Sequence, residues 1–216
     1  MPHFMNYRLF CIIFCLYTVT SFAQNELENT KKENSITQDT LLAGQLLDTA
    51  QMQIRVGKFD QALLLIDSAG VIYERTVGKE SMEYTDYLLF KALFHFYTEE
   101  FDICLEFAKR SLDIRITTFG ETHLSTARPW HFMGLCYNFK QDYKKALTCH
   151  NKALNIQLIN LKEGEVLIID SYGSIGSVYE KIGDYDRAIS YLEKSLEIDK
   201  KNMENETKNS VVLTTI

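Results

Sequence analysis

The stretch ARPWHFMGLCYNFKQDYKKALTCHNKAL, residues 127–154, contains two apolar patterns joined by a short polar turn, KQDY (140–143). On both sides of the turn, apolar residues recur every three or four positions, which is the period of an amphipathic helix. Similar turns between similar patterns occur at GKFD (57–60), EEFD (99–102) and GDYD (183–186). The chain therefore consists largely of repeated helical hairpins.

Several columns of residues recur at an interval of 42 positions, which identifies a repeat array. Within the second helix of each unit the recurring positions are spaced by 4, 3 and 3 residues, so they share one helical face. Small side chains in these columns allow the two helices of a hairpin to approach closely. The columns are Ala50, Ala92, Gly134, Gly176; Phe59, Phe101, Tyr143, Tyr185; Ala62, Cys104, Ala146, Ala188; Ile66, Ala108, His150, Leu192; Ala69, Ser111, Ala153, Ser195; and Ile72, Ile114, Ile156, Ile198.

The junctions between units carry their own signals. Gly78 and Gly120 stand just past a second helix, where a residue in the left-handed conformation commonly ends a helix. Lys162 breaks this column, with Gly164 two positions later. Pro129 falls inside a first helix, and we expect a slight irregularity there, with the proline in or just past the first turn.

The first 23 residues are predicted to be an export signal. Arg8 supplies the positive charge, an apolar run extends from Leu9 to Val19, and small residues at Ser21 and Ala23 suit cleavage after Ala23. The run is shorter than the roughly 20 residues that span a bilayer. We therefore expect an exported protein, periplasmic or secreted, with no membrane span after signal removal. An anchor formed by an uncleaved N-terminal segment is the minority alternative.

The charge balance argues against nucleic acid as a partner. The predicted signal contains one arginine and no acid, so its removal leaves 22 basic and 29 acidic residues, a formal charge of −7. Binding to phosphate backbones relies on clustered lysine and arginine, and no basic stripe interleaved with aromatics is visible. Residues 24–40 are polar without an apolar period, which predicts a flexible leader before the first helix.

No motif for catalysis, cofactor binding or metal binding stands out. The pair Gly173 and Gly176 lacks the third glycine and preceding strand of a phosphate loop. Cys149 and His150 are adjacent on a helix and point about 100° apart, so a packed histidine is the better interpretation. A disulfide between Cys136 and Cys149, which an exported location would permit, is a minority possibility.

The repeated residues resemble the tetratricopeptide repeat, whose pattern has a large apolar residue, an apolar–small pair and an aromatic residue before two alanines. The 42-residue period and the segment GETHLSTA (120–127) are similar to the longer variety found in kinesin light chains and in exported bacterial proteins. The matching residues are Trp130, Met133, Gly134, Tyr137, Ala146 and Ala153, then Tyr172, Ile175, Gly176, Tyr179, Ala188 and Ser195.

The resemblance implies an all-α, right-handed superhelical solenoid of antiparallel helix pairs over residues 41–203. We expect units at about 41–80, 81–122, 123–164 and 165–206. Residues 207–216 align with the opening of a first helix, which predicts the truncated start of a fifth unit. Because arrays normally end in a helix with a polar outer face, we expect that the native protein continues or that another chain covers the fourth unit.

The resemblance also implies a binding site, since the first helices of such arrays line a concave groove. We expect a non-catalytic scaffold that binds a protein or peptide there, although Leu89 and Leu93 could instead pack against neighbouring helices. The alternatives are the sensory segment of a larger bacterial enzyme, such as a caspase-like protease or sensor kinase, and self-association through the fourth unit. The implied groove residues are Asp86, Leu89, Leu93, Phe96, Arg128, His131, Leu135, Asn138, Asp170, Gly173, Ser177 and Glu180.

Overall fold

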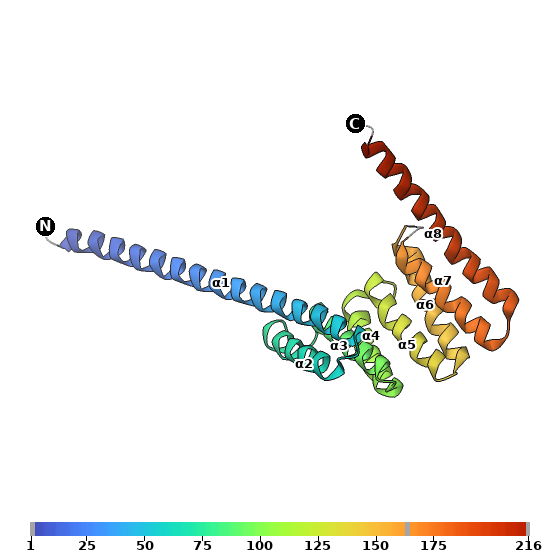
Figure 1. The fold of residues 1–216 in the computed structure, drawn as a ribbon. Coiled ribbons are helices and arrows are strands. Elements are labelled where there is room, and N and C mark those ends of the chain that lie inside the picture. Colours follow the sequence, from blue (N-terminus) through green and yellow to red (C-terminus); the bar gives the residue numbers. More distant parts are fainter. Residues whose placement is uncertain (1–2, 163–164, 215–216) are drawn as a thin grey trace.

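The computed structural model describes residues 3–162 and 165–214, and throughout these residues the regular secondary structure is helical. This confirms the all-α prediction. Eight α-helices and one short 3-10 helix follow one another along an extended array (Figure 1). They are α1 (His3–Arg55), α2 (Phe59–Thr76), α3 (Met82–Tyr97), α4 (Phe101–Phe119), η1 (Leu124–Thr126), α5 (Ala127–Phe139), α6 (Tyr143–Asn160), α7 (Val166–Ile182) and α8 (Tyr185–Thr214).

The helices pack as four hairpins, α1 with α2, α3 with α4, α5 with α6, and α7 with α8, and each hairpin packs on the next. The first helices of successive units also contact one another, α1 with α3, α3 with α5, and α5 with α7. Within the described residues, the second helices of successive units make no such contacts. Because the first helices are closer together, they line the inner side of the array.

All four hairpin turns have the same backbone geometry. One or two residues past the end of each first helix, one residue has a positive φ, between 62° and 86°, and its N–H bonds to the carbonyl three residues back. The following N–H bonds to the carbonyl five residues back, as in a Schellman motif. These turns satisfy helix-end carbonyls at a 42-residue interval. The positive-φ residues are Gly57, Glu99, Gln141 and Gly183.

Buried side chains form three apolar clusters, one at each junction between neighbouring units. The second-helix columns supply much of the core, since Ala62, Cys104 and Ala146 are fully buried. The expected irregularity at Pro129 is confirmed, because a 3-10 turn precedes α5 and the proline is the third residue of that helix. At this position its missing N–H leaves no hydrogen bond unmade.

Residues 24–40 differ from the expected flexible leader, because they continue α1. The sequence has neither glycine nor proline from His3 to Ala43, and its glutamates, lysines and glutamines favour helix. Nothing therefore interrupts the helix that leads into the first unit. Its core contacts begin at Ala43, and residues 28–35 are exposed, so this part projects from the array (Figure 1). The signal peptide over residues 1–23 stays a prediction.

The C-terminal segment also differs from expectation. Residues 207–214 lie in α8, which runs from Tyr185 without the turn that a fifth unit requires. The sequence has no glycine or proline after Gly183, whereas glycines follow the second helices of the first two units. A continuous helix is the physical consequence. Ile216, the end of the predicted segment, lies outside the described residues.

Candidate ligand groove

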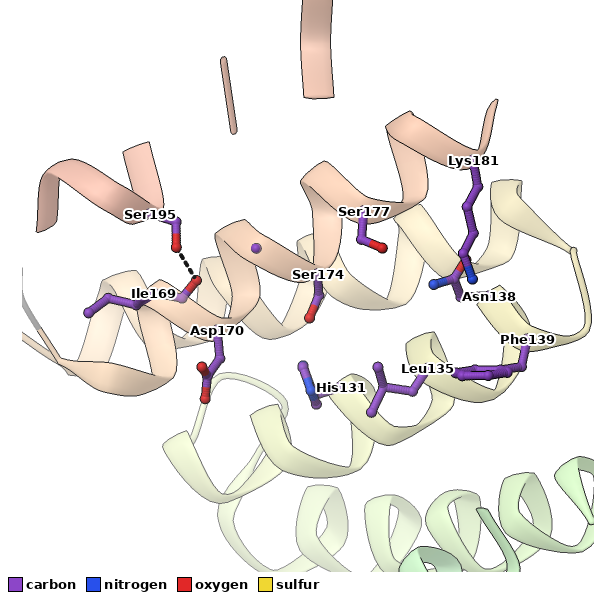
Figure 2. Close-up of a pocket in the computed structure, with 11 residues that line it drawn as sticks. His131, Leu135, Asn138, Phe139, Ile169, Asp170, Ser174, Ser177, Lys181 and Ser195 are labelled. Atoms are coloured by element: carbon purple, nitrogen blue, oxygen red, sulfur yellow. Dashed lines mark hydrogen bonds between the residues drawn. The ribbon is translucent and has the colours of Figure 1, made fainter. Parts of the chain in front are cut away.

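An open pocket of about 530 Å³ lies on the inner side of the array between α5 and α7 (Figure 2). Half of the predicted groove residues line it: His131, Leu135, Asn138, Asp170, Gly173 and Ser177. Sequence reasoning missed Phe139, Ile169, Ser174, Lys181 and Ser195, which line the same pocket. Phe139 and Lys181 could have been found, because each follows a predicted groove residue by four positions and so shares its helical face.

One end of the pocket combines an apolar surface with a cation. Phe139 is half exposed, and its ring stacks on Phe101 at a centroid distance of 5.5 Å. The ammonium group of Lys181 lies 5.0 Å from the centre of the Phe139 ring. Leu135 continues this surface toward the middle of the pocket (Figure 2). This end can therefore receive an apolar side chain next to an acidic group.

Asn138 supplies a buried hydrogen-bond acceptor to the pocket. Its side chain is 6% exposed, and its Oδ1 atom has no hydrogen-bond partner among the described residues. A buried carbonyl without a donor costs free energy, about 1–3 kcal/mol. A ligand N–H group would recover this cost after a rotation of the Asn138 amide that turns the covered Oδ1 toward the pocket.

The other end of the pocket carries a free carboxylate and a neutral imidazole. Asp170 is exposed and forms no ion pair within the described part of the chain. Burial lowers the pKa of His131, and the positive charge of Arg128 acts in the same direction, although Asp170 opposes the shift. His131 is therefore uncharged at neutral pH, and Asp170 is available to a basic group.

Gly173 opens the middle of the pocket. A Cβ atom placed there would meet only Ser195 Oγ, at 3.9 Å, which is an ordinary contact distance. A Cβ atom at position 173 therefore fits without displacing the protein, and a longer side chain would extend into the pocket that Gly173 lines. This geometry makes Gly173 the natural site at which to block the groove.

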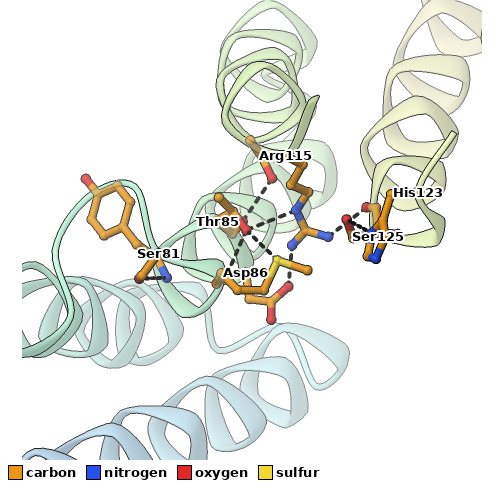
Figure 3. Close-up of polar contacts among 9 residues, drawn as sticks. Ser81, Thr85, Asp86, Arg115, His123 and Ser125 are labelled. Carbon is orange, nitrogen blue, oxygen red and sulfur yellow. Dashed lines mark hydrogen bonds and ion pairs between the residues drawn. The ribbon is translucent and has the colours of Figure 1, made fainter. Parts of the chain in front are cut away.

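Asp86 is engaged within the array and is not free for a ligand. Its carboxylate accepts a hydrogen bond from Arg115, whose side chain is 3% exposed (Figure 3). Arg115 also donates to Thr85 Oγ1 at 3.0 Å and to the carbonyl of Ser125 at 2.8 Å. The guanidinium group thus ties α3 and α4 to the start of the third unit.

The remaining predicted groove residues either pack against neighbouring helices or lie exposed at the surface. Leu89 has no exposed surface, so its assignment to the groove is wrong, and the packing alternative describes it because the second and third units close over it. Leu93 is half-buried against two apolar clusters, and the Phe96 ring lies 5.1 Å from Phe139, beside the pocket. Arg128 and Glu180 are exposed.

The pair Cys149 and His150 lacks the properties of a nucleophile and its base. Burial raises the pKa of Cys149 to about 11, and burial next to His131 lowers the pKa of His150 to about 3. Both side chains are in the core, and the thiols of Cys104, Cys136 and Cys149 are unbridged.

Within the described residues, no cluster of three or more His, Cys, Asp or Glu side chains is placed to hold a metal ion. No helix there is both long and apolar enough to cross a membrane.

Comparison with known families agrees with this architecture. Tetratricopeptide repeat models match residues 84–159 and 169–202, together just over half of the chain. The chain belongs to the tetratricopeptide repeat family. The resemblance inferred from the repeat columns is thereby confirmed, and arrays of this family are generally scaffolds for protein–protein interaction. No curated protein sequence matches the chain.

Several solved tetratricopeptide arrays share the fold at low sequence identity. BtubC (BKLC) from P. vanneervenii is 22% identical with a TM-score of 0.65, covering 77% of this chain and 66% of that one. A kinesin light chain from Podosopora anserina with nearly identical TPR-like repeats is 17% identical with a TM-score of 0.64, covering 76% of this chain and 77% of that one. The sensor-containing STAND protein PH0952 from Pyrococcus horikoshii is 19% identical with a TM-score of 0.60, covering 79% of this chain and 26% of that one.

Proposed function

We propose that this tetratricopeptide array is a non-catalytic scaffold that binds an extended peptide segment of a partner protein between α5 and α7. The observation that carries the proposal is the buried, unpartnered Oδ1 of Asn138 on the wall of a pocket of about 530 Å³. A peptide backbone supplies N–H donors at regular intervals, so it suits this acceptor.

The pocket also indicates the kind of segment that fits. Asp170 and Lys181 are eleven residues apart on α7, about 16 Å along the helix axis. An extended peptide covers that distance with about five residues. The best ligand therefore has a basic group near Asp170, an acidic group near Lys181 and an apolar side chain against Leu135 and Phe139.

Selection of random linear peptides by the chain, followed by affinity measurement with groove variants, tests this proposal. Gly173→Leu is the sharpest variant, because its side chain enters the pocket and leucine favours helix more than glycine does. We expect loss of peptide binding with unchanged or increased thermal stability. Gly44→Ala, on α1 and outside the pocket, is the control that keeps binding. Selected peptides that bind Gly173→Leu as tightly as the parent chain would contradict the proposal.

Export is part of the proposal and rests on the apolar segment Leu9–Val19 and the small residues before Gln24. If the signal is cleaved after Ala23, N-terminal sequencing of the native protein starts at Gln24, and the mass is about 22 kDa. A native N-terminus at Met1 in a membrane fraction would support the uncleaved anchor instead.

A regulatory segment of a larger enzyme is the second candidate function. The similarity to PH0952 favours it, because that protein is described as having a tetratricopeptide repeat sensor and the matched part is 26% of its length. An immunoblot of source cells against the array separates the two candidates. A single band near 22 kDa supports the separate scaffold, whereas a much larger band supports the regulatory segment.

A further inference from the structure

The outward face of α8 is apolar, like the corresponding face of the second helix in each of the first three units, but in those units the face is covered. Tyr185, Ile189, Leu192 and Leu196 are 65%, 54%, 44% and 51% exposed. Their equivalents in the preceding units are half-buried or buried. The Leu192 column is fully buried at Ile66, Ala108 and His150, and the Leu196 column is 3% and 5% exposed at Leu112 and Leu154. In those units the first helix of the next unit packs on this helix, and the Leu192 column also faces the first helix of its own unit.

The opposite end of the array carries polar residues at two of the positions that are apolar in the other units. The positions that pack on a preceding unit hold Tyr87 and Phe90 in the second unit and Pro129 and Phe132 in the third. The first unit has Gln45 and Asp48 in these columns, and both are exposed; the same face also carries two exposed apolar residues, Leu41 and Met52. The N-terminal end is thus a poor match for the apolar face of α8, which disfavours head-to-tail association of copies.

The spacing of the exposed α8 residues makes the face complementary to itself. Tyr185, Ile189, Leu192, Leu196 and Met203 are separated by 4, 3, 4 and 7 positions, which is the heptad spacing of a coiled-coil seam with one polar position, Asp199. All five side chains are exposed. Two copies of such a seam can interdigitate, so α8 can serve as its own partner.

Charges beside the seam favour one relative direction of the two helices. One flank is occupied by the array itself, since Ala188 is buried and Ser195 donates to the carbonyl of Ile169 at 3.1 Å. The free flank carries Asp186, Glu193 and Lys200, seven residues apart and exposed. In an antiparallel pair, the free flanks face each other, with Asp186 of each helix opposite Lys200 of the other and the two Glu193 side chains opposite one another at the centre.

We infer that α8 forms an antiparallel pair with α8 of a second copy of this chain, giving a closed dimer about a two-fold axis. The inference goes beyond the proposed function, because the seam lies on α8 and the peptide groove lies between α5 and α7. Each copy keeps its own groove in the dimer, so two grooves act together on a partner with two sites.

Sedimentation equilibrium of the full chain over a wide range of concentration tests the dimer. We expect a reversible monomer–dimer equilibrium, and Leu192→Glu with Leu196→Glu weakens it at least about 100-fold. Leu64→Glu is the matched control, because Leu64 is 71% exposed on α2, away from the seam, and its variant stays dimeric. Circular dichroism checks that each variant keeps its helical content. A monomer at every concentration, or a dimer that survives both seam substitutions, overturns the inference.

Charge exchange tests the direction of pairing. Lys200→Glu makes the free flank wholly acidic and weakens an antiparallel dimer about five- to tenfold. Combining it with Asp186→Lys and Glu193→Lys reverses every charge and restores the affinity. A dimer insensitive to Lys200→Glu, or not restored by the combined variant, overturns the antiparallel arrangement.

Discussion

The imidazole ring of His150 occupies the space into which a side chain at Gly134 would extend. A Cβ atom on Gly134 would lie 2.6 Å from Cε1 of His150, and one on Gly176 would lie 2.9 Å from Cγ of Leu192. Each glycine thus faces a large residue on the second helix of its own unit. The second unit has Ala92 and Ala108 at the corresponding positions, both fully buried.

Gly134→Ala is therefore expected to destabilise the chain by about 2 kcal/mol, because the new methyl group overlaps a rigid buried ring. In a His150→Ala background the same change costs much less, since the pair then reproduces the Ala92–Ala108 contact of the second unit. Urea unfolding of the four chains gives the coupling energy. If the two substitutions have additive effects on the free energy of unfolding, contact with His150 is not the reason that position 134 requires glycine.

From the burial of His150 we also predict that the stability of the folded chain decreases as the pH decreases. Its pKa is about 3 in the folded chain and near 6.5 when unfolded. Between these values the unfolded chain binds a proton that the folded chain excludes, so folding weakens as pH falls. From pH 7 to pH 5 the loss from His150 is about 2 kcal/mol, and the lowered pKa of His131 acts in the same direction.

His150→Leu tests this assignment, because Leu192 already faces a glycine in the fourth unit. We expect denaturant unfolding of this variant to show a smaller loss of stability between pH 7 and pH 5. An identical pH profile for the parent chain and His150→Leu would contradict the assignment.

Two hairpin turns should become more stable when glycine is introduced. Glu99 and Gln141 each have a φ of 62°, where a side chain is strained, whereas Gly57 and Gly183 occupy the same position in the other two units. Glu99→Gly and Gln141→Gly are each expected to stabilise by about 0.5–1 kcal/mol. Thermal unfolding measures the gain, and Gly57→Ala should show a loss. A decrease in stability for both glycine variants would oppose this view of the turns.

Arg115 is expected to stabilise the junction between the second and third units. Arg115→Ala leaves the Thr85 hydroxyl and the Ser125 carbonyl without this donor, and we expect a loss of about 3 kcal/mol. Arg110→Ala, at an exposed arginine of the same helix, should change stability by less than about 0.5 kcal/mol. Equal effects in urea unfolding would mean that the Arg115 network contributes little.

The repeat architecture could be predicted from the sequence because it depends on local patterns. The small residues Ala62, Cys104 and Ala146 and the turn that contains Gly57 recur at a fixed interval, and each marks a helical face or a helix end. Residues 24–40 could not be placed in the same way. They have no apolar period, and their helix follows from the absence of any residue that ends it.

The groove could be predicted only in part, because exposure depends on how neighbouring units close over each side chain. Leu89 and His131 occupy equivalent positions in their first helices, 42 residues apart, yet Leu89 is buried and His131 lines the pocket. The engagement of Asp86 by Arg115 joins residues 29 positions apart, which helical spacing does not reveal. Lys181 could have been predicted from the helical period, because it follows Ser177 by four positions and shares its helical face.

Photo-cross-linking in source cells tests the central claim most directly, using a photoreactive residue at Leu135 in the groove and, in a separate chain, at Leu64 on α2. We expect that Leu135 forms an adduct with a partner protein, that Gly173→Leu in the same chain abolishes it, and that Leu64 does not form it. An adduct that persists with Gly173→Leu, or that forms only from Leu64, would contradict binding in the groove.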